Sequence, residues 1–115
     1  MTDCIFCRIA RGEIPAKEIA RTSGAVAFHD LNPQAPVHVL VVPVTHIENA
    51  AATDTEDGGR VLSEVMRLSV QVARQLGLED TGYRLVMNVG KNGGQSVGHL
   101  HVHVLGGRPM AWPPG

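Results

Sequence analysis

Three histidines stand on alternate residues near the C-terminal end of this sequence, at His99, His101 and His103. Alternation of polar and apolar residues is typical of a half-buried strand, whose side chains point to opposite faces of a sheet. We therefore expect the three imidazoles to share one face, about 6.7 Å apart along the strand, while Leu100 and Val102 enter the core. Imidazoles in a row can bind a metal, transfer protons or act as nucleophiles. The alternative is an exposed polar strand face, which would more naturally carry Thr, Lys or Glu.

A glycine-rich loop, residues 90–96, leads directly into this histidine strand. Gly93 and Gly94 allow positive φ and close approach of the backbone, so consecutive N–H groups can point at an anion. Ser96 adds a hydroxyl and Gln95 an amide. Two adjacent glycines alone more often mark an ordinary hairpin turn. Beside a row of imidazoles they favour an anionic substrate held against a histidine.

Two further polar residues lie at or near predicted strands. His38 stands in the apolar run 37–44, where a histidine is usually a satisfied core residue. Here it can lie beside the histidine strand and hydrogen-bond into the row of imidazoles. Asp30 sits at a strand end, so it is either a turn residue or a carboxylate that accepts hydrogen bonds from the two vicinal hydroxyls of a ribose.

Two cysteines, Cys4 and Cys7, form a Cys-x-x-Cys near the N-terminus. Residues 3–12 around them are predicted to form a short helix, with Asp3 as the candidate N-cap and Gly12 at its end. In a reducing compartment this spacing indicates metal or redox chemistry more than a structural disulfide. Two free thiols that only pack in a short amphipathic helix are the alternative.

Five runs of apolar and β-branched residues predict the strands that must position these groups. They lie at residues 17–22, 25–30, 37–44, 83–89 and 98–105. A long amphipathic helix is predicted from a Thr53-x-x-Glu56 capping box to Gly77, although Gly58-Gly59 is unfavourable in its first turns. The pattern indicates an α+β domain of about five mainly antiparallel strands, with the long helix on one face.

The composition limits the classes of function. A chain of 115 residues with 43% apolar residues suits one domain with a small core. The net charge of −1 gives no basic excess for general nucleic-acid binding. No apolar stretch approaches the roughly 20 residues that span a bilayer, and the first residues lack the pattern of a signal peptide. We therefore expect a cytoplasmic protein with no nucleic-acid or membrane partner.

Several stretches together resemble a known family. The segment His99-Leu100-His101-Val102-His103-Val104-Leu105 matches the motif of the histidine triad (HIT) superfamily. Further stretches are similar to its Hint branch, the histidine triad nucleotide-binding proteins: Phe28-His29-Asp30, Pro33-Gln34-Ala35-Pro36, His38, Pro43, His46-Ile47, Asn88, Gly93-Gly94-Gln95-Ser96-Val97 and Trp112-Pro113-Pro114-Gly115. The similarity runs from Cys4 to Gly115 and favours one domain over residues 1–115.

The resemblance implies a homodimer with a continuous ten-stranded sheet, five strands from each subunit. It also implies a purine nucleoside phosphoramidase, which cleaves the P–N bond of substrates such as adenosine 5′-phosphoramidate. His101 would be the nucleophile and form a nucleotidyl-histidine intermediate that water hydrolyses. His103 would contact the phosphate and help to protonate the leaving group, with Ser96 near the departing nitrogen. His99 and His38 complete the catalytic set.

The resemblance also implies where a nucleotide binds. The phosphate would be held by the backbone N–H groups of Ser96 and Val97, with Asn88, Gly94 and Gln95. Apolar residues would form the base pocket, and these are Ile5, Phe6, Ile9, Phe28 and Leu31. Asp30, beside His29, would bind the ribose. The tail, residues 108–115, would place Trp112 at the partner subunit's site, where its prolines reduce the entropy lost on ordering.

By resemblance to nucleotidyltransferases of the superfamily, Cys4, Cys7, His46 and His99 would bind a structural zinc ion. Two thiolates and two imidazoles form a good tetrahedral zinc set. Gly98 departs from the family, since an aromatic residue is common at that position. Three other readings stay open: hydrolysis of dinucleoside polyphosphates or nucleotidyl transfer, a nonenzymatic nucleotide-binding adaptor, and a metal enzyme that uses all three triad histidines.

Overall fold

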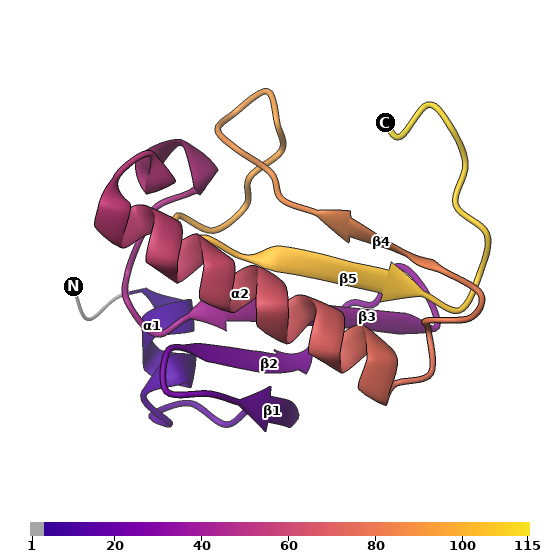
Figure 1. The fold of residues 1–115 in the computed structure, drawn as a ribbon, viewed down its shortest axis with the longest axis horizontal. Coiled ribbons are helices and arrows are strands. Elements are labelled where there is room, and N and C mark those ends of the chain that lie inside the picture. Colours follow the sequence, from indigo (N-terminus) through magenta and orange to yellow (C-terminus); the bar gives the residue numbers. More distant parts are fainter. Residues whose placement is uncertain (1–3) are drawn as a thin grey trace.

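The computed structural model describes residues 4–115, which form an antiparallel sheet with helices packed against it (Figure 1). Its five strands are β1 (Glu18–Arg21), β2 (Ala25–His29), β3 (Val37–Pro43), β4 (Tyr83–Val86) and β5 (Val102–Gly106). The helices are α1 (Ile5–Ala10), the 3-10 helix η1 (Ala50–Thr53) and the long α2 (Glu56–Gln75). The strand order is β1-β2-β3-β5-β4, with every neighbouring pair antiparallel. The α+β class expected from the sequence is confirmed.

The central strands bury both of their faces. Val39 and Val41 of β3 and Val104 of β5 pack in the core that α2 covers. Leu40 and Val42, which alternate with them, join a second core beneath α1. Because β3 is covered on both sides, its sequence is a nearly continuous apolar run rather than an alternating one. The histidine face of β5 is the face that α1 covers.

Helix α1 is anchored by buried residues from its second position onward, beginning with Phe6. Its N-cap is Cys4, whose Sγ accepts a hydrogen bond from the Cys7 N–H at 3.4 Å. Asp3, the N-cap expected from the sequence, lies outside the described residues. The helix is short and ends at Ala10, with the backbone N–H of Arg11 bonded to carbonyls of the last turn. It is therefore held by packing and by its cap rather than by its length.

The start of α2 differs from the prediction. Thr55 is the N-cap, and its hydroxyl accepts from the Gly58 N–H at 2.9 Å. Thr53, expected at that position, ends η1 and donates its own hydroxyl to the Ala50 carbonyl. Gly58 is needed here because a Cβ would come within 2.6 Å of the Thr53 Cα. The glycine that weakens the sequence prediction therefore allows η1 to pack closely against α2.

The histidine strand is shorter than expected, because β5 starts at Val102 rather than at residue 98. The Leu100 N–H bonds to the Ile47 carbonyl at 2.6 Å, so this segment follows the loop after β3 instead of the ladder. The alternation nevertheless continues through it: Leu100 and Val102 both join the core beneath α2. Strand β4 also ends early, at Val86 rather than at residue 89.

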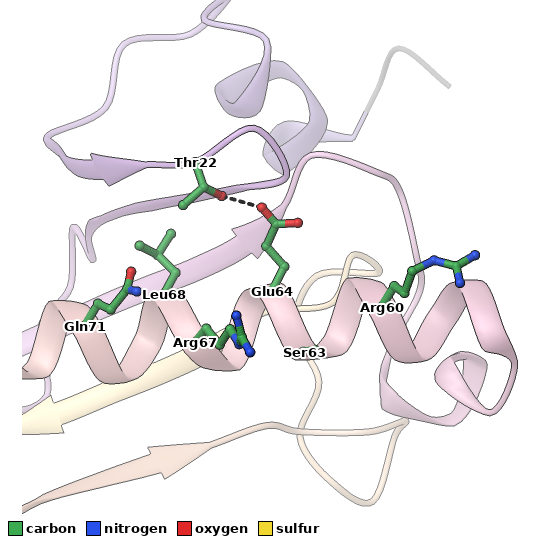
Figure 2. A pocket seen from close by; sticks show the side chains of 7 residues that line it. All are labelled: Thr22, Arg60, Ser63, Glu64, Arg67, Leu68 and Gln71. Carbon is green, nitrogen blue, oxygen red and sulfur yellow. Dashed lines mark hydrogen bonds between the residues drawn. The ribbon is translucent and has the colours of Figure 1, made fainter.

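An open groove of about 510 Å³ lies between α2 and the turn that joins β1 to β2 (Figure 2). Its lining residues are Thr22, Arg60, Ser63, Glu64, Arg67, Leu68 and Gln71. The Glu64 carboxylate accepts hydrogen bonds from the Thr22 hydroxyl at 2.7 Å and from the Gly24 N–H at 3.0 Å. These bonds fasten the turn to α2 on the face opposite the histidines. Within residues 4–115, no helix is both long and apolar enough to cross a membrane.

Candidate functional site

The three triad histidines lie on the α1 face, as the alternation predicts. His99 and His101 are buried, with 0% and 3% of their surface exposed, and His103 is half-buried. The rings of His101 and His103 have centroids 5.0 Å apart. Phe6 of α1 meets the ring of His101 edge-on at 5.2 Å and that of His99 at 5.9 Å. Helix α1 is therefore in direct contact with the histidine row.

The tautomer of His101 is fixed by the backbone. Its Nδ1 lies 2.8 Å from the His99 carbonyl oxygen, which can only accept a hydrogen bond. The proton of the neutral imidazole therefore sits on Nδ1, and Nε2 carries a lone pair. A buried imidazole held in this way is prepared to act as a nucleophile.

His38 and His103 form a second fixed pair. The Gln34 N–H donates to His38 Nδ1 at 3.0 Å, so the neutral His38 ring carries its proton on Nε2. That Nε2–H donates to His103 Nδ1 at 2.9 Å, which leaves the His103 proton on Nε2. Burial lowers the pKa of His38. Burial, helped by His101 and His38, lowers the pKa of His103 to about 4, so both rings are neutral at neutral pH.

Asp30 has the first of the two roles that the sequence allows, that of a turn residue, and it also lies beside His38. One carboxylate oxygen, Oδ1, accepts from the Asn32 N–H at 2.8 Å and closes a turn. The other, Oδ2, lies 3.4 Å from His38 Nε2. Ligand atoms of Asp30, His38 and His103 lie within 4.8 Å of one another, close enough to surround a metal ion. The Gln34 N–H argues against that use, because it keeps the proton on the His38 nitrogen that a metal would need.

Four side chains that can bind a metal converge around His99 Nδ1, His99 included, and they are the residues chosen from the sequence: Cys4, Cys7, His46 and His99. His99 Nδ1 lies 3.3 Å from Cys4 Sγ, 3.5 Å from Cys7 Sγ and 3.1 Å from His46 Nδ1. The Cys7 Sγ to His46 Nδ1 distance is 3.2 Å. All four ligand atoms lie within 4.8 Å of one another.

This donor set fits a zinc ion. A tetrahedral Zn²⁺ with two nitrogen and two sulfur ligands holds them roughly 3.3–3.8 Å apart, close to the observed distances. His99 Nε2 donates to the Pro43 carbonyl at 2.9 Å, which directs the Nδ1 lone pair to the other three donors. Burial raises the pKa of the Cys7 thiol, with Cys4 adding to the effect, so without a cation this thiol keeps its proton. A bound dication would favour the thiolate.

An apolar cavity of about 210 Å³ opens next to the histidine row. The predicted pocket residues all line it, and these are Ile5, Phe6, Ile9, Phe28 and Leu31, together with His29 and Asp30. The wall is completed by five residues that were not predicted, namely Ile14, Pro15, Ala16, Lys17 and Leu40. The antiparallel pairing could have indicated Lys17, because the His29 N–H bonds to its carbonyl. Phe6 joins the cavity to His101.

The glycine-rich loop has the close backbone approach expected of it, while the N–H groups of Gly94 and Gln95 bond to the Lys91 and Gly90 carbonyls within the loop. Gly94 adopts a φ of +78°, and a Cβ on Gly93 would lie within 2.9 Å of the Val89 nitrogen. Val97 packs against the core beneath α1, while Ser96 is exposed and Asn88 is half-buried.

The Gln95 side chain is used inside the loop. Its oxygen accepts from the Asn49 amide and the Gly90 N–H, and its nitrogen donates to the Glu48 and Val97 carbonyls. Gln95 thus braces the loop that carries Ser96 and Val97. A phosphate would reach its amide only by exchanging these bonds.

The C-terminal tail lies apart from the cavity. It leaves β5 at the end of the sheet far from α1 (Figure 1). Trp112 is 81% exposed, and the cavity beside the histidines contains no tail residue among those that line it. Arg84 of β4 holds the tail through the Ala111 carbonyl at 2.9 Å. Trp112 is therefore a predicted site residue that the described chain does not bring to the cavity.

Comparison with known proteins places this architecture in a family. The family model for the HIT domain matches residues 11–110. The chain belongs to the HIT family. A 14 kDa zinc-binding protein of Zea mays is 46% identical over 112 residues, which cover 96% of this chain and 87% of that protein.

Solved structures agree with the family assignment. A HIT family hydrolase from Legionella pneumophila matches with a TM-score of 0.93 and 44% identity, over 98% of this chain and all of that one. A histidine triad nucleotide-binding protein from Candida albicans matches with a TM-score of 0.81 and 29% identity. That match covers 96% of this HIT chain and 83% of the Candida chain.

Proposed function

We propose that this HIT protein is a purine nucleoside phosphoramidase of the Hint type. The observation that carries the proposal is His101: a buried imidazole whose Nδ1–H is held by the His99 carbonyl, which leaves the Nε2 lone pair free for attack. The apolar cavity beside it suits a purine, since Phe6 and Phe28 supply aromatic rings to its wall. The names of the Legionella and Candida relatives, a hydrolase and a nucleotide-binding protein, support the same class.

The reaction follows from the tautomers. A bond forms between His101 Nε2 and the α-phosphorus while the phosphorus–nitrogen bond breaks. The leaving amine takes up a proton from solvent, and the Nε2–H of His103 and the Ser96 hydroxyl help by donating hydrogen bonds to the departing group. Water then displaces His101 and returns a proton, so that the nucleotide and the free amine are the net products. Splitting one displacement into two lowers the barrier to each.

The remaining residues bind and orient the nucleotide. The free edge of Asp30 Oδ2 accepts hydrogen bonds from the ribose hydroxyls, beside His29 at the cavity rim. The N–H groups of Ser96 and Val97, on the loop braced by Gln95, hold the phosphate with Asn88 and Gly94. Leu31, exposed in the free chain, covers the base when it binds. No organic cofactor is needed for this chemistry.

We further propose that Cys4, Cys7, His46 and His99 bind a zinc ion with a structural role. The converging donors support this, as does the zinc-binding relative in maize. All four positions are taken by protein ligands, so the metal supplies a cross-link and no open site for substrate. The cross-link ties α1, and with it Phe6, to the triad segment.

The test of the function is a comparison of three substrates with the purified full chain. We expect adenosine 5′-phosphoramidate and its lysine conjugate to be hydrolysed at rates well above that of a dinucleoside polyphosphate. Preferred cleavage of the polyphosphate would favour the alternative hydrolase or nucleotidyltransferase reading. Tight binding of adenosine monophosphate with no turnover of any substrate would favour the adaptor reading.

We also propose that residues 1–115 form one domain that dimerises through an extended sheet. Strand β4 pairs only with β5 among the described strands, so its outer edge is open to a second copy. The exposed Trp112, on a tail stiffened by Pro109 and Pro113, suits an anchor on the partner subunit.

Deleting residues 109–115 should therefore change substrate preference and lower kcat/KM several-fold while the fold of the core survives. Sedimentation should report a dimer for the full chain, and circular dichroism should show the same fold in both forms. A full-length monomer at micromolar concentration, with activity unaltered by the deletion, would rule this arrangement out.

A further inference from the structure

The tail begins with a contact that the proposed function does not use. Arg108 lies two residues beyond the end of β5, and its guanidinium donates twice to the Gln34 carbonyl, from Nε at 3.3 Å and from an Nη at 2.9 Å. Gly107, with a φ of +90°, lets the chain turn here. A Cβ on Gly107 would lie 2.8 Å from the Pro36 side chain. The start of the tail is thus packed against the loop that precedes β3.

The same loop residue controls the pair of histidines. Gln34 donates its N–H to His38 Nδ1 at 3.0 Å, and this bond decides which nitrogen of His38 holds the proton. His38 in turn decides the tautomer of His103 through the 2.9 Å contact between Nε2 and Nδ1. The backbone N–H of Gln34 therefore sets, through His38, which nitrogen of His103 carries the proton.

We propose that Arg108 is a positioning residue: by holding the Gln34 carbonyl, it keeps the Gln34 N–H on His38 and so keeps the His103 proton on Nε2. The inference rests on the proposed function, since it is in that reaction that His103 donates from Nε2. Arg108 itself touches neither the cavity nor the triad among the contacts of the described residues.

Other contacts hold the two ends of this loop, through the turn at Asp30 and the packing of Pro36 on Gly107, but Arg108 is what holds the Gln34 carbonyl. Leu31, Asn32, Pro33 and Gln34 are exposed, and the Gln34 side chain bonds only to the Asn32 carbonyl. If the loop shifts, His38 Nδ1 loses the Gln34 N–H that bonds to it, and the other neutral tautomer becomes accessible. His103 would then face a nitrogen that cannot donate, and its own proton would move to Nδ1. The planar fork of Arg108 suits this task because it offers two donors to one acceptor.

The test reads the imidazole nitrogens directly in the free protein. In the wild type labelled with ¹⁵N-histidine at neutral pH, we expect long-range ¹H–¹⁵N spectra to show His38 and His103 protonated on Nε2, and His101 on Nδ1. Arg108→Gln should move the His38 and His103 signals toward a mixture of tautomers and leave those of His101 unchanged. With adenosine 5′-phosphoramidate, kcat should fall about three- to tenfold, the value of one hydrogen bond, with KM within about twofold.

Two further variants separate the effect of the Arg108 hydrogen bonds from a general loosening of the tail. Arg108→Lys keeps the charge and can make one hydrogen bond to the Gln34 carbonyl in place of two, so its spectra and kcat should lie between those of the wild type and Arg108→Gln. Arg84→Gln loosens the same tail at Ala111 without touching Gln34, and it should leave the His38 and His103 signals unchanged. Unaltered signals in Arg108→Gln, or equal changes in Arg84→Gln, would overturn the proposal. Because the spectra need no substrate, failure of the proposed reaction would leave this test intact.

Discussion

His101→Ala should abolish turnover of adenosine 5′-phosphoramidate, with kcat lowered on the order of 10⁴-fold or more, as for other lost nucleophiles. The reason is geometric. His101 is held by the His99 carbonyl with its Nε2 lone pair available, while the Nε2 of His103 carries a proton. His103 therefore cannot replace it without exchanging tautomer. Rapid quenching and intact-mass measurement should find a nucleotidylated protein with the wild type and none with the variant.

Binding should survive this substitution. The cavity is walled by residues of α1, β2 and the segment before β1, so adenosine monophosphate should bind His101→Ala with an affinity within about tenfold of the wild type. His103→Ala provides the matched comparison, because it removes the neighbouring imidazole and keeps the nucleophile. It should be slower than the wild type and still form the intermediate. Full turnover by His101→Ala, or an intermediate that persists in it, would contradict the assignment.

The spacing of apolar residues made much of this site predictable from the sequence, because it indicates which side chains face the core. The alternation through residues 99–104 gives the face of every triad histidine, even though β5 begins only at Val102. The apolar residues around Cys4 and Cys7 likewise indicate which side of α1 faces the cavity. Periodicity survives a break in the hydrogen-bond ladder because the core selects side-chain direction, and the segment before Val102 still packs against it.

The features that escaped prediction depend on contacts between residues with no shared pattern. Thr53 and Thr55 can both cap a helix, and only the packing of η1 against Gly58 selects Thr55. The bond from Leu100 to Ile47, which delays β5, joins segments far apart in the chain. The Gln34 N–H on His38 is a backbone contact, which residue types alone do not reveal.

Gln95 shows a different limit. Its residue type and its place beside Ser96 predict an amide that faces a phosphate. The structure uses all of that amide to brace the loop, through Gly90, Asn49 and two carbonyls. A glutamine in a glycine-rich loop can either bind a phosphate or bond to the loop itself, because such a loop leaves backbone N–H and C=O groups without regular partners. The contacts of the neighbouring loop at Glu48 and Asn49 decide between them.

The double variant Cys4→Ser/Cys7→Ser should lose a zinc ion that the wild type binds at about one per chain, and it should be markedly less stable. A ligand that binds only the folded state stabilises it by about 3–4 kcal/mol at 100 to 1,000 times its dissociation constant. For a domain of this size that corresponds to a decrease in Tm of roughly 10–20 °C. Metal analysis and thermal unfolding in zinc-containing buffer measure the two effects.

The wild type stripped of metal by a chelator is the necessary control. Cys7 is buried, so serine there also costs stability by burying a hydroxyl, and that cost remains when variant and wild type are compared without metal. The part of the stability loss that appears in zinc-containing buffer and not in the metal-free comparison is therefore due to the zinc site. Metal loss should also weaken binding of adenosine monophosphate, because α1, which supplies Phe6 to the cavity, is fixed to His99 through this cluster. A wild type that takes up no zinc, with the same Tm in zinc and in chelator, would reduce the cysteines to packing residues.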